Sequence, residues 1–190
     1  MRMRARITIP QRRRIFLGCE GESERSYGLL LNRLADASGR SIYIDAQVLQ
    51  PGGGDPLKLV EMALSRIGRR IRSHGRYTFM ALLLDKDKIG SKPERDREAS
   101  TKAVQNGLLL IWQDPCHEAV LLRHFEGCHD LRPQTSRAAL SELLRKWPDY
   151  RKGMPERRLS QRLDLEHVRR AAGVEGDLKN FLTRIGLFGA

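Results

Sequence analysis

The sequence predicts an α/β fold: a mostly parallel sheet of about four strands, flanked by helices and followed by a helical C-terminal extension. Two observations lead to this prediction. Four short apolar runs of strand length alternate with segments in which apolar residues recur at helical spacing, which is typical of a parallel sheet covered by helices. After Gly127 only helical patterns follow, which predicts the extension.

Four segments have the length and composition of strands, and the first of them is a short continuous apolar run, as expected for a strand that is buried on both faces. They lie at residues 15–19, 41–49, 77–84 and 108–112. The third run, YTFMALLL, is the most hydrophobic segment of the chain and leads directly into Asp85.

Helical patterns separate these strands. Ser23 is the expected N-cap of the first helix. Asp55 and Pro56 suit the N-cap and first position of the clearest helix, which Gly75 ends, and a loop of Pro51–Gly54 precedes it. We expect further helices over residues 98–106 and 116–125.

The C-terminal part of the chain is helical and basic. Its helical patterns cover residues 135–147, 160–172 and 175–185. We therefore predict an α/β domain over residues 1–127 and a helical extension over residues 128–190 that packs on the same domain.

Composition points to a cytoplasmic protein with a polyanionic partner. The 190 residues include 35 Lys and Arg against 23 Asp and Glu, for a formal net charge of +12, which favours nucleic acid as that partner. No apolar run approaches the roughly 20 residues of a membrane helix, so we expect no membrane contact. The basic N-terminus is not followed by the apolar segment of a secretion signal, and three cysteines do not make a disulfide framework.

Acidic residues follow two of the predicted strands. Glu20 comes directly after the first strand, and Asp85 and Asp87 come directly after the third. Functional groups gather at the carboxyl ends of parallel strands, and alternation along an extended chain places both aspartates on one side. Glu24 lies one helical turn beyond Glu20 and can turn back toward it.

Clustered carboxylates form the hard, oxygen-rich type of site that Mg²⁺ and Mn²⁺ prefer. Glu20, Asp85 and Asp87 are the candidate ligands. The alternative is that these acids only serve the turns after the strands, for which aspartate is well suited.

Glu118 allows two interpretations. It lies near the end of the fourth strand and can face the metal pocket, or it can be an acid that favours a helix N-terminus. His124 is six residues away and points to a different side of the same helix, so a structural or hydrogen-bonding role suits it. The nearby Cys116 and Cys128 match no zinc-ligand spacing and are expected to be free buried thiols.

Several basic residues are candidates for contact with nucleic acid. Four arginines of the helix that begins after Asp55 lie off its apolar stripe and face water or a partner. They are Arg66, Arg69, Arg70 and Arg72. Lys152 is a further candidate for a phosphate contact, against the alternative of an exposed loop lysine.

The acidic motifs resemble those of a known domain. Cys19-Glu-Gly-Glu-Ser-Glu24 after the first strand and Leu-Leu-Asp85-Lys-Asp87 after the third resemble the Toprim domain of topoisomerases, primases and overcoming-lysogeny-defect nucleases. The chain is more similar to the RloB-like family, small bacterial Toprim-related proteins that are associated with phage defence. Segments 114–125 and 149–152 resemble further motifs of that family, and the resemblance extends from about Arg14 to Ala172.

The resemblance implies a metal-assisted reaction on a phosphodiester. It implies that Asp85 and Asp87 bind Mg²⁺ and that Glu20 is a general acid or base or a further metal ligand. Around Glu118 the chain departs from the family pattern, since His117 and Ala119 replace aromatic residues.

Two functions stay open from the sequence. The first is a Mg²⁺- or Mn²⁺-dependent nuclease in phage defence, with Glu20, Glu24, Asp85, Asp87 and Glu118 as catalytic residues. The second is a basic nucleic-acid-binding or sensing subunit that has a non-catalytic acidic pocket and works beside other defence proteins. A haloacid-dehalogenase-like phosphatase is disfavoured, because the Asp-x-Asp pair of that class follows its first strand, whereas Asp85 and Asp87 follow the third predicted strand of this chain. The sequence does not indicate the oligomeric state.

Overall fold

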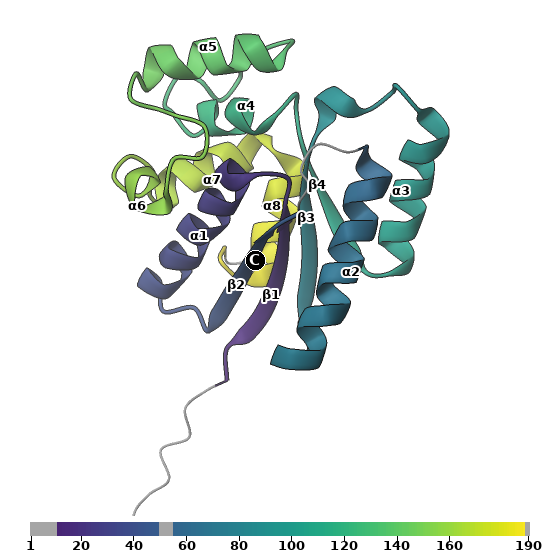
Figure 1. Cartoon of the computed structure of the whole chain (residues 1–190). Coiled ribbons are helices and arrows are strands. Elements are labelled where there is room, and N and C mark those ends of the chain that lie inside the picture. The colour runs from purple at the N-terminus through teal and green to yellow at the C-terminus, as the bar shows by residue number, and fades with distance from the viewer. Residues whose placement is uncertain (1–10, 50–54, 189–190) are drawn as a thin grey trace, which may run out of the picture.

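The computed structural model of the chain describes residues 11–49 and 55–188. The predicted loop Pro51–Gly54 and most of the basic N-terminal segment lie outside the described residues. The structure contains one sheet of four parallel strands in the order β2-β1-β3-β4 (Figure 1). The strands are β1 (Arg13–Cys19), β2 (Ile42–Val48), β3 (Phe79–Asp85) and β4 (Leu108–Gln113). The predicted fold class is confirmed, and all described strands are parallel.

Helices cover both faces of the sheet and its carboxyl edge. α1 (Glu22–Ala37), α7 (Leu165–Val174) and α8 (Gly176–Ile185) lie on one side, and α2 (Pro56–His74) and α3 (Pro93–Gln105) lie on the other (Figure 1). α4 (His117–Leu122) and α5 (Ser136–Lys146) lie above the carboxyl ends of the strands, and the short α6 (Glu156–Leu159) packs beside α1.

The alternation of side chains along the strands divides the interior into two cores. Ile15 and Leu17 of β1 face the core that α1 shares with the C-terminal helices, whereas Phe16 faces the core beneath α2 and α3. Phe181 and Leu182 of α8 are completely buried in the first core. Residues of the predicted extension therefore complete the core on the α1 side of the sheet.

A close approach of backbones joins α1 to the sheet. A Cβ atom placed on Gly28 would lie 2.9 Å from Ala46 Cβ and 2.9 Å from Leu17 Cδ2. Only glycine fits this position without displacing a neighbour, which fixes the distance of α1 from β1 and β2.

The helices differ from the predictions at five places. The helix predicted over residues 160–172 is α7, which begins only at Leu165 because the Asp164 side chain caps it by accepting from the His167 N–H. The short α6 was not predicted.

The N-cap of α1 is Gly21 and not Ser23, since the helix begins one residue before Ser23. α3 begins at Pro93, which makes it longer than predicted. α4 spans only residues 117–122, because the chain leaves the helix at Arg123, whose side chain bonds to distant groups.

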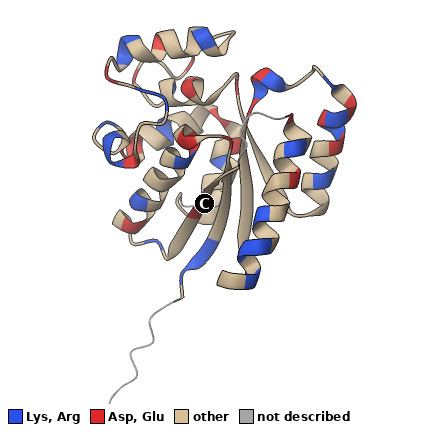
Figure 2. Cartoon of the chain, viewed as in Figure 1, with Lys and Arg blue, Asp and Glu red and all other residues tan. Residues whose placement is uncertain are grey.

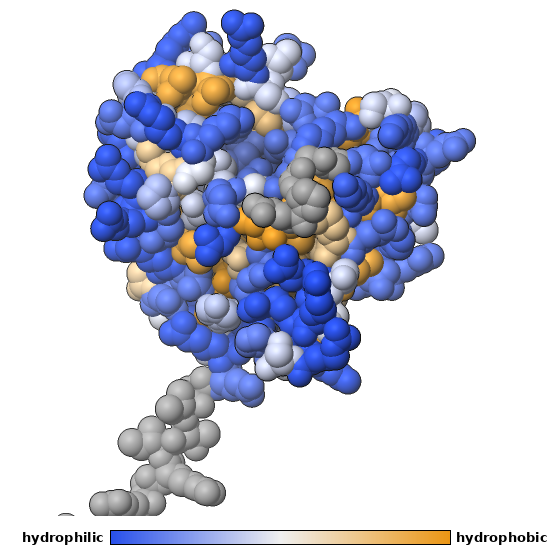
Figure 3. Space-filling view, viewed as in Figure 1, coloured by the Kyte–Doolittle hydropathy of each residue, from blue (hydrophilic) through white to orange (hydrophobic). Residues whose placement is uncertain are grey.

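The outer surface is polar. Hydrophilic side chains cover most of the face seen in Figure 3, and the apolar ones form smaller groups between them. Among the described residues, no helix is both long enough and apolar enough to cross a membrane.

Candidate active site

The carboxyl ends of β1 and β3 open into a cavity of about 540 Å³ with acidic walls. We call it the acidic cavity. Its lining residues come from the start of α1, the end of β3, the start of α4 and the loop before α6. They are Glu20, Gly21, Glu22, Ser23, Glu24, Asp85, His117, Glu118, Lys152 and Gly153. Figure 2 shows the acidic ribbon segments gathered where the strands end.

Strand order explains why Glu20 and Asp85 share this cavity. β1 and β3 are hydrogen-bonded neighbours with Gly18 opposite Leu82, so both chains leave the sheet at the same edge. Glu20 follows the end of β1, and Asp85 is the last residue of β3. The strand-end rule thus brings these two predicted site residues together.

Glu24 turns back toward the end of β1, as its spacing suggested. The Gly21 N–H donates a hydrogen bond to Glu24 Oε2 at 3.1 Å, which ties this carboxylate to the first turn of α1. The negative charge also suits the N-terminal end of the helix. Glu24 is therefore held at the cavity wall although it is almost completely buried.

Asp85 lies at the centre of the negative charge. Burial raises its pKa to about 8, and repulsion from Glu24, Asp87 and Glu118 adds to this effect. The His117 N–H, which donates to Asp85 Oδ1 at 3.0 Å, opposes it. At neutral pH this carboxyl group is mostly protonated, and a bound cation would displace the proton.

Two lysines form ion pairs with two further carboxylates of the acidic cavity. Lys88 pairs with Glu20, and burial lowers the pKa of Lys88. Lys152 Nζ lies 3.2 Å from Glu118 Oε1, although the lysine side chain is 61% exposed and the glutamate only 3%. Burial tends to raise the pKa of Glu118, but His117 and Lys152 hold it below its usual range.

A hydroxyl group also fixes Glu118. Tyr150, whose side chain is buried, donates from its hydroxyl to Glu118 Oε1 at 3.3 Å. The predicted alternative in which Glu118 faces the acidic cavity agrees with this position. His124 of the same segment instead bonds to the Tyr27 hydroxyl at 2.9 Å and to the Val120 carbonyl at 2.8 Å, so it has the hydrogen-bonding role we favoured.

His117 is a cavity residue that the sequence did not identify as part of the site. Its Nδ1 lies 2.7 Å from Gln113 Nε2, and the side chain is buried. Its Nε2 has no hydrogen-bond partner. Its position directly before Glu118 was the only signal available from the sequence.

Asp87 lies outside the lining of the acidic cavity. The prediction that alternation places Asp85 and Asp87 on one side assumed an extended chain, but residues Lys86–Lys88 form a turn of 3₁₀ helix. Asp87 is exposed, and its Oδ2 accepts a hydrogen bond from the Ser136 hydroxyl at 2.6 Å. Its role as a metal ligand stays a prediction.

The donor set fits a hard divalent ion in its chemistry. All five acidic side chains that line the cavity are carboxylates, and Glu20 Oε2 is a buried oxygen with no hydrogen-bond partner among the described residues. In the arrangement seen here, no group of three His, Cys, Asp or Glu side chains among the described residues is placed to hold a metal ion. Glu20 would first have to leave Lys88.

The predicted basic residues of α2 fall into two groups. Arg66 and Arg69 line a separate cavity of about 270 Å³, and Arg72 is exposed. Arg70 does not face a partner, because its Nε donates to Asp45 Oδ2 at 2.7 Å and to the Tyr77 hydroxyl at 3.1 Å.

Asp45 accounts for the inward position of Arg70. Its side chain is only 3% exposed, and Arg14 Nη2 also donates to it at 3.1 Å. A buried carboxylate of this kind needs cationic partners, so Arg70 stabilises the fold at the edge of the sheet.

The fold and the acidic cavity define an α/β protein with its candidate site at the carboxyl edge of a parallel sheet, where such proteins place ligands. A sequence model of the RloB-like protein family matches residues 15–178. The chain therefore belongs to the RloB-like protein family, as its motifs suggested. No curated protein and no solved structure matches the chain.

Proposed function

We propose that the protein is a metal-dependent nuclease, or a related phosphodiester-cleaving enzyme, that acts in bacterial phage defence. The observation that carries the proposal is the acidic cavity itself. Five carboxylates, from the ends of β1 and β3 and the starts of α1 and α4, line one cavity of a protein whose formal net charge is +12. Burial and neighbouring carboxylates raise the pKa of one of them, Asp85, to about 8, which is typical of a functional site.

Glu20, Glu24 and Asp85 are the residues that would hold Mg²⁺ or Mn²⁺ in the cavity. Asp87 would join them only by leaving the Ser136 hydroxyl. When bound, such an ion neutralises a phosphate oxygen and lowers the pKa of a water molecule.

The other residues of the cavity have roles that do not depend on direct contact with the ion. Glu118, whose pKa His117 and Lys152 hold below its usual range, would accept a proton from a water molecule in the cavity. Lys152, at the exposed side of the cavity, can move from Glu118 to a phosphate oxygen. Its long, mostly exposed side chain and its single positive charge suit such an exchange.

The role in defence rests on the family. Membership of the RloB-like family and the Toprim-like strand-end motifs support a reaction on nucleic acid, and the association of the family with phage defence supports the setting.

A cleavage assay tests the proposal. Purified protein is incubated with DNA and with RNA in Mg²⁺ or Mn²⁺, next to the variants Glu20→Gln and Asp85→Asn. Asp130→Asn is a matched control, since this carboxylate is 84% exposed and distant in sequence from the cavity residues. We expect metal-dependent cleavage by the wild type and the control, and its loss in both cavity variants. Cleavage that persists in both cavity variants would contradict the assigned site.

The second candidate function is a nucleic-acid-binding or sensing subunit. The observation that favours it is the pairing of Glu20 with Lys88 and of Glu118 with Lys152, which neutralises two carboxylates without a metal. Binding of nucleic acid by all variants, without cleavage of any substrate, would support this function over the nuclease.

A further inference from the structure

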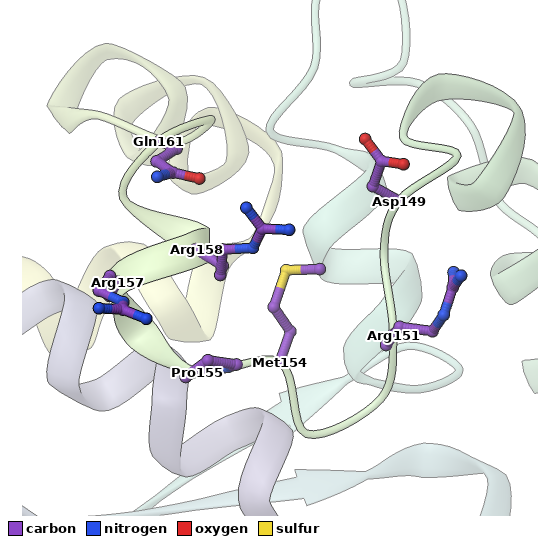
Figure 4. Close-up of a pocket in the computed structure, with 7 residues that line it drawn as sticks. All are labelled: Asp149, Arg151, Met154, Pro155, Arg157, Arg158 and Gln161. Carbon is purple, nitrogen blue, oxygen red and sulfur yellow. The ribbon is translucent and has the colours of Figure 1, made fainter.

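A second cavity, with basic walls, lies beside α6. It has a volume of about 570 Å³ (Figure 4). We call it the arginine cavity. Its lining residues are Asp149, Arg151, Met154, Pro155, Arg157, Arg158 and Gln161. In Figure 4, Arg158 and Gln161 reach toward Met154 from one wall, and Asp149 and Arg151 belong to the facing loop.

A neighbouring hollow extends the arginine cavity. This hollow of about 310 Å³ shares four lining residues with it and adds Trp147 and Arg162. Arginines therefore outnumber acids by four to one along the combined surface, where Asp149 is the single acid.

The arginines of this surface have no acidic partners among the described residues. The two nearby glutamates are already engaged, Glu156 with Arg33 and Glu166 with Arg169. None of the ion pairs within residues 11–49 and 55–188 includes Arg157, Arg158 or Arg162.

Arg151 also forms no ion pair among the described residues, but unlike the other three arginines its side chain is hydrogen-bonded to the backbone of its own loop. It donates to the carbonyls of Pro148 and Tyr150. No carboxylate neutralises it, so its positive charge is also available to an anion.

One loop connects the arginine cavity to the acidic cavity. Lys152 and Gly153 line the acidic cavity, whereas their neighbours Arg151 and Met154 line the arginine cavity. The Gly153 N–H donates to the Ser23 hydroxyl at 2.8 Å, which fixes the loop against the first turn of α1. The two cavities therefore share one short loop as part of their walls.

The shared loop suits one continuous ligand, since a nucleic-acid strand carries a phosphate at every nucleotide and can contact both cavities as it passes this loop. We propose that the arginine cavity binds the phosphodiester backbone of the nucleic acid that the acidic cavity acts on. The inference rests on the proposed function, because that function makes the acidic cavity the place where the strand is cleaved.

The chemistry of the walls favours phosphate over bases. A guanidinium group donates two parallel hydrogen bonds that match a phosphate. The only aromatic residue that lines this surface, Trp147, is 2% exposed and offers no face on which a base could stack. Binding here is thus independent of base sequence.

A salt titration of binding tests the inference. The full chain is titrated onto fluorescently labelled DNA and RNA oligonucleotides in EDTA, so that no metal contributes and no cleavage occurs. The variant is Arg157→Ala/Arg158→Ala. We expect it to bind at least about tenfold more weakly, and its plot of log affinity against log salt to lose a slope of about one for each arginine.

A matched variant controls for the change in net charge. Arg40→Ala/Arg76→Ala removes two exposed arginines that precede β2 and β3, at the opposite edge of the sheet from the cavities. We expect this variant to retain the salt slope and nearly the affinity of the wild type. Equal thermal unfolding of both variants shows that the changed side chains are exposed and not structural.

Several outcomes would overturn the inference. These are a wild-type protein that binds neither nucleic acid, an Arg157→Ala/Arg158→Ala variant with an unchanged slope, or an equal loss in the control. If cleavage is absent but the arginine variant loses binding, the proposed nuclease fails while the binding site stands. If cleavage occurs and the variant binds normally, the binding site fails while the nuclease stands.

Discussion

The substitution Asp85→Asn is expected to stabilise the metal-free protein. Asn has the shape of Asp and keeps an oxygen that accepts the His117 N–H, but it carries no charge. It also removes repulsion from Glu24, Asp87 and Glu118, which all raise the pKa of Asp85.

The pKa of Asp85 sets the size of this effect. Burial and neighbouring acids raise it from 3.8 to about 8 in the folded protein. At about 1.4 kcal/mol for each pKa unit, ionising this buried group above pH 8 costs at most roughly 6 kcal/mol. Because the surroundings relax around a charge, we expect about 2 kcal/mol, or an increase in Tm of about 4–8 °C for a chain of this length.

The sign of the pH dependence follows from the same shift. A carboxyl group whose pKa is raised by folding stabilises the folded protein below pH 3.8, and this contribution is lost as the pH rises to about 8. The variant does not lose it. The gain in stability of Asp85→Asn over the wild type should therefore grow between about pH 5 and pH 8 and stay constant at higher pH.

Urea unfolding in EDTA, followed by circular dichroism across this pH range, measures the difference. Asp87→Asn is the matched control because Asp87 is exposed and bonds to the Ser136 hydroxyl, and we expect little change in its stability. The reasoning is refuted if Asp85→Asn is destabilised at pH 8 or if its stability difference is independent of pH.

Three further predictions concern other contacts. Lys88→Ala should bind Mn²⁺ about fivefold more tightly in calorimetry without nucleic acid, because Lys88 competes with a metal ion for Glu20; weaker binding would contradict this competition. Arg123→Met should lower the free energy of unfolding by about 3–5 kcal/mol, since it leaves the partly buried Glu175 unpaired. Urea unfolding should show that adding Glu175→Gln restores part of this loss, and a purely additive double variant would argue against the pair. Gly28→Ala should destabilise by about 1–3 kcal/mol in the same assay because its Cβ overlaps the sheet, and an unchanged midpoint would show that α1 can move away.

The sheet was predictable because buried parallel strands have a simple signature. β1, β3 and β4 each contain a continuous apolar run that can be found without tertiary information, whereas β2 is interrupted by Asp45 and Gln47. The start of α3 was not predictable in this way. Its first turn is polar, and only Ala99 and Ala103 of the helix are buried, so no apolar stripe marks the segment.

The candidate site was predictable only as far as the strand ends reach. Glu20 and Asp85 come together because β1 and β3 are adjacent, which follows from the fold class. Glu118 and Lys152 meet because α4 and the loop after α5 pack together, and sequence spacing does not encode this contact. The prediction that Asp87 lies on the same side as Asp85 assumed an extended chain. The chain instead forms a turn of 3₁₀ helix at Lys86–Lys88, and Asp87 lies outside the lining of the acidic cavity.

The choice between lysine and arginine distinguishes the fold from the candidate site. Away from the acidic cavity, buried carboxylates pair with arginines: Asp45 with Arg70, and Glu175 with Arg123. A guanidinium fork holds a carboxylate in a fixed geometry, which suits a permanent contact.

The mostly buried carboxylates that form ion pairs at the acidic cavity are held by lysines, Glu20 by Lys88 and Glu118 by Lys152, whereas the exposed Glu22 pairs with Arg25. An ammonium group is a mobile point charge that a metal ion or a phosphate can replace without rebuilding a planar pair. Under the proposed function, the carboxylates that a reaction would need to release are thus held by the cation that leaves most readily. The arginines beside α6, which form no ion pair among the described residues, would then supply the fixed contacts that a phosphate backbone requires.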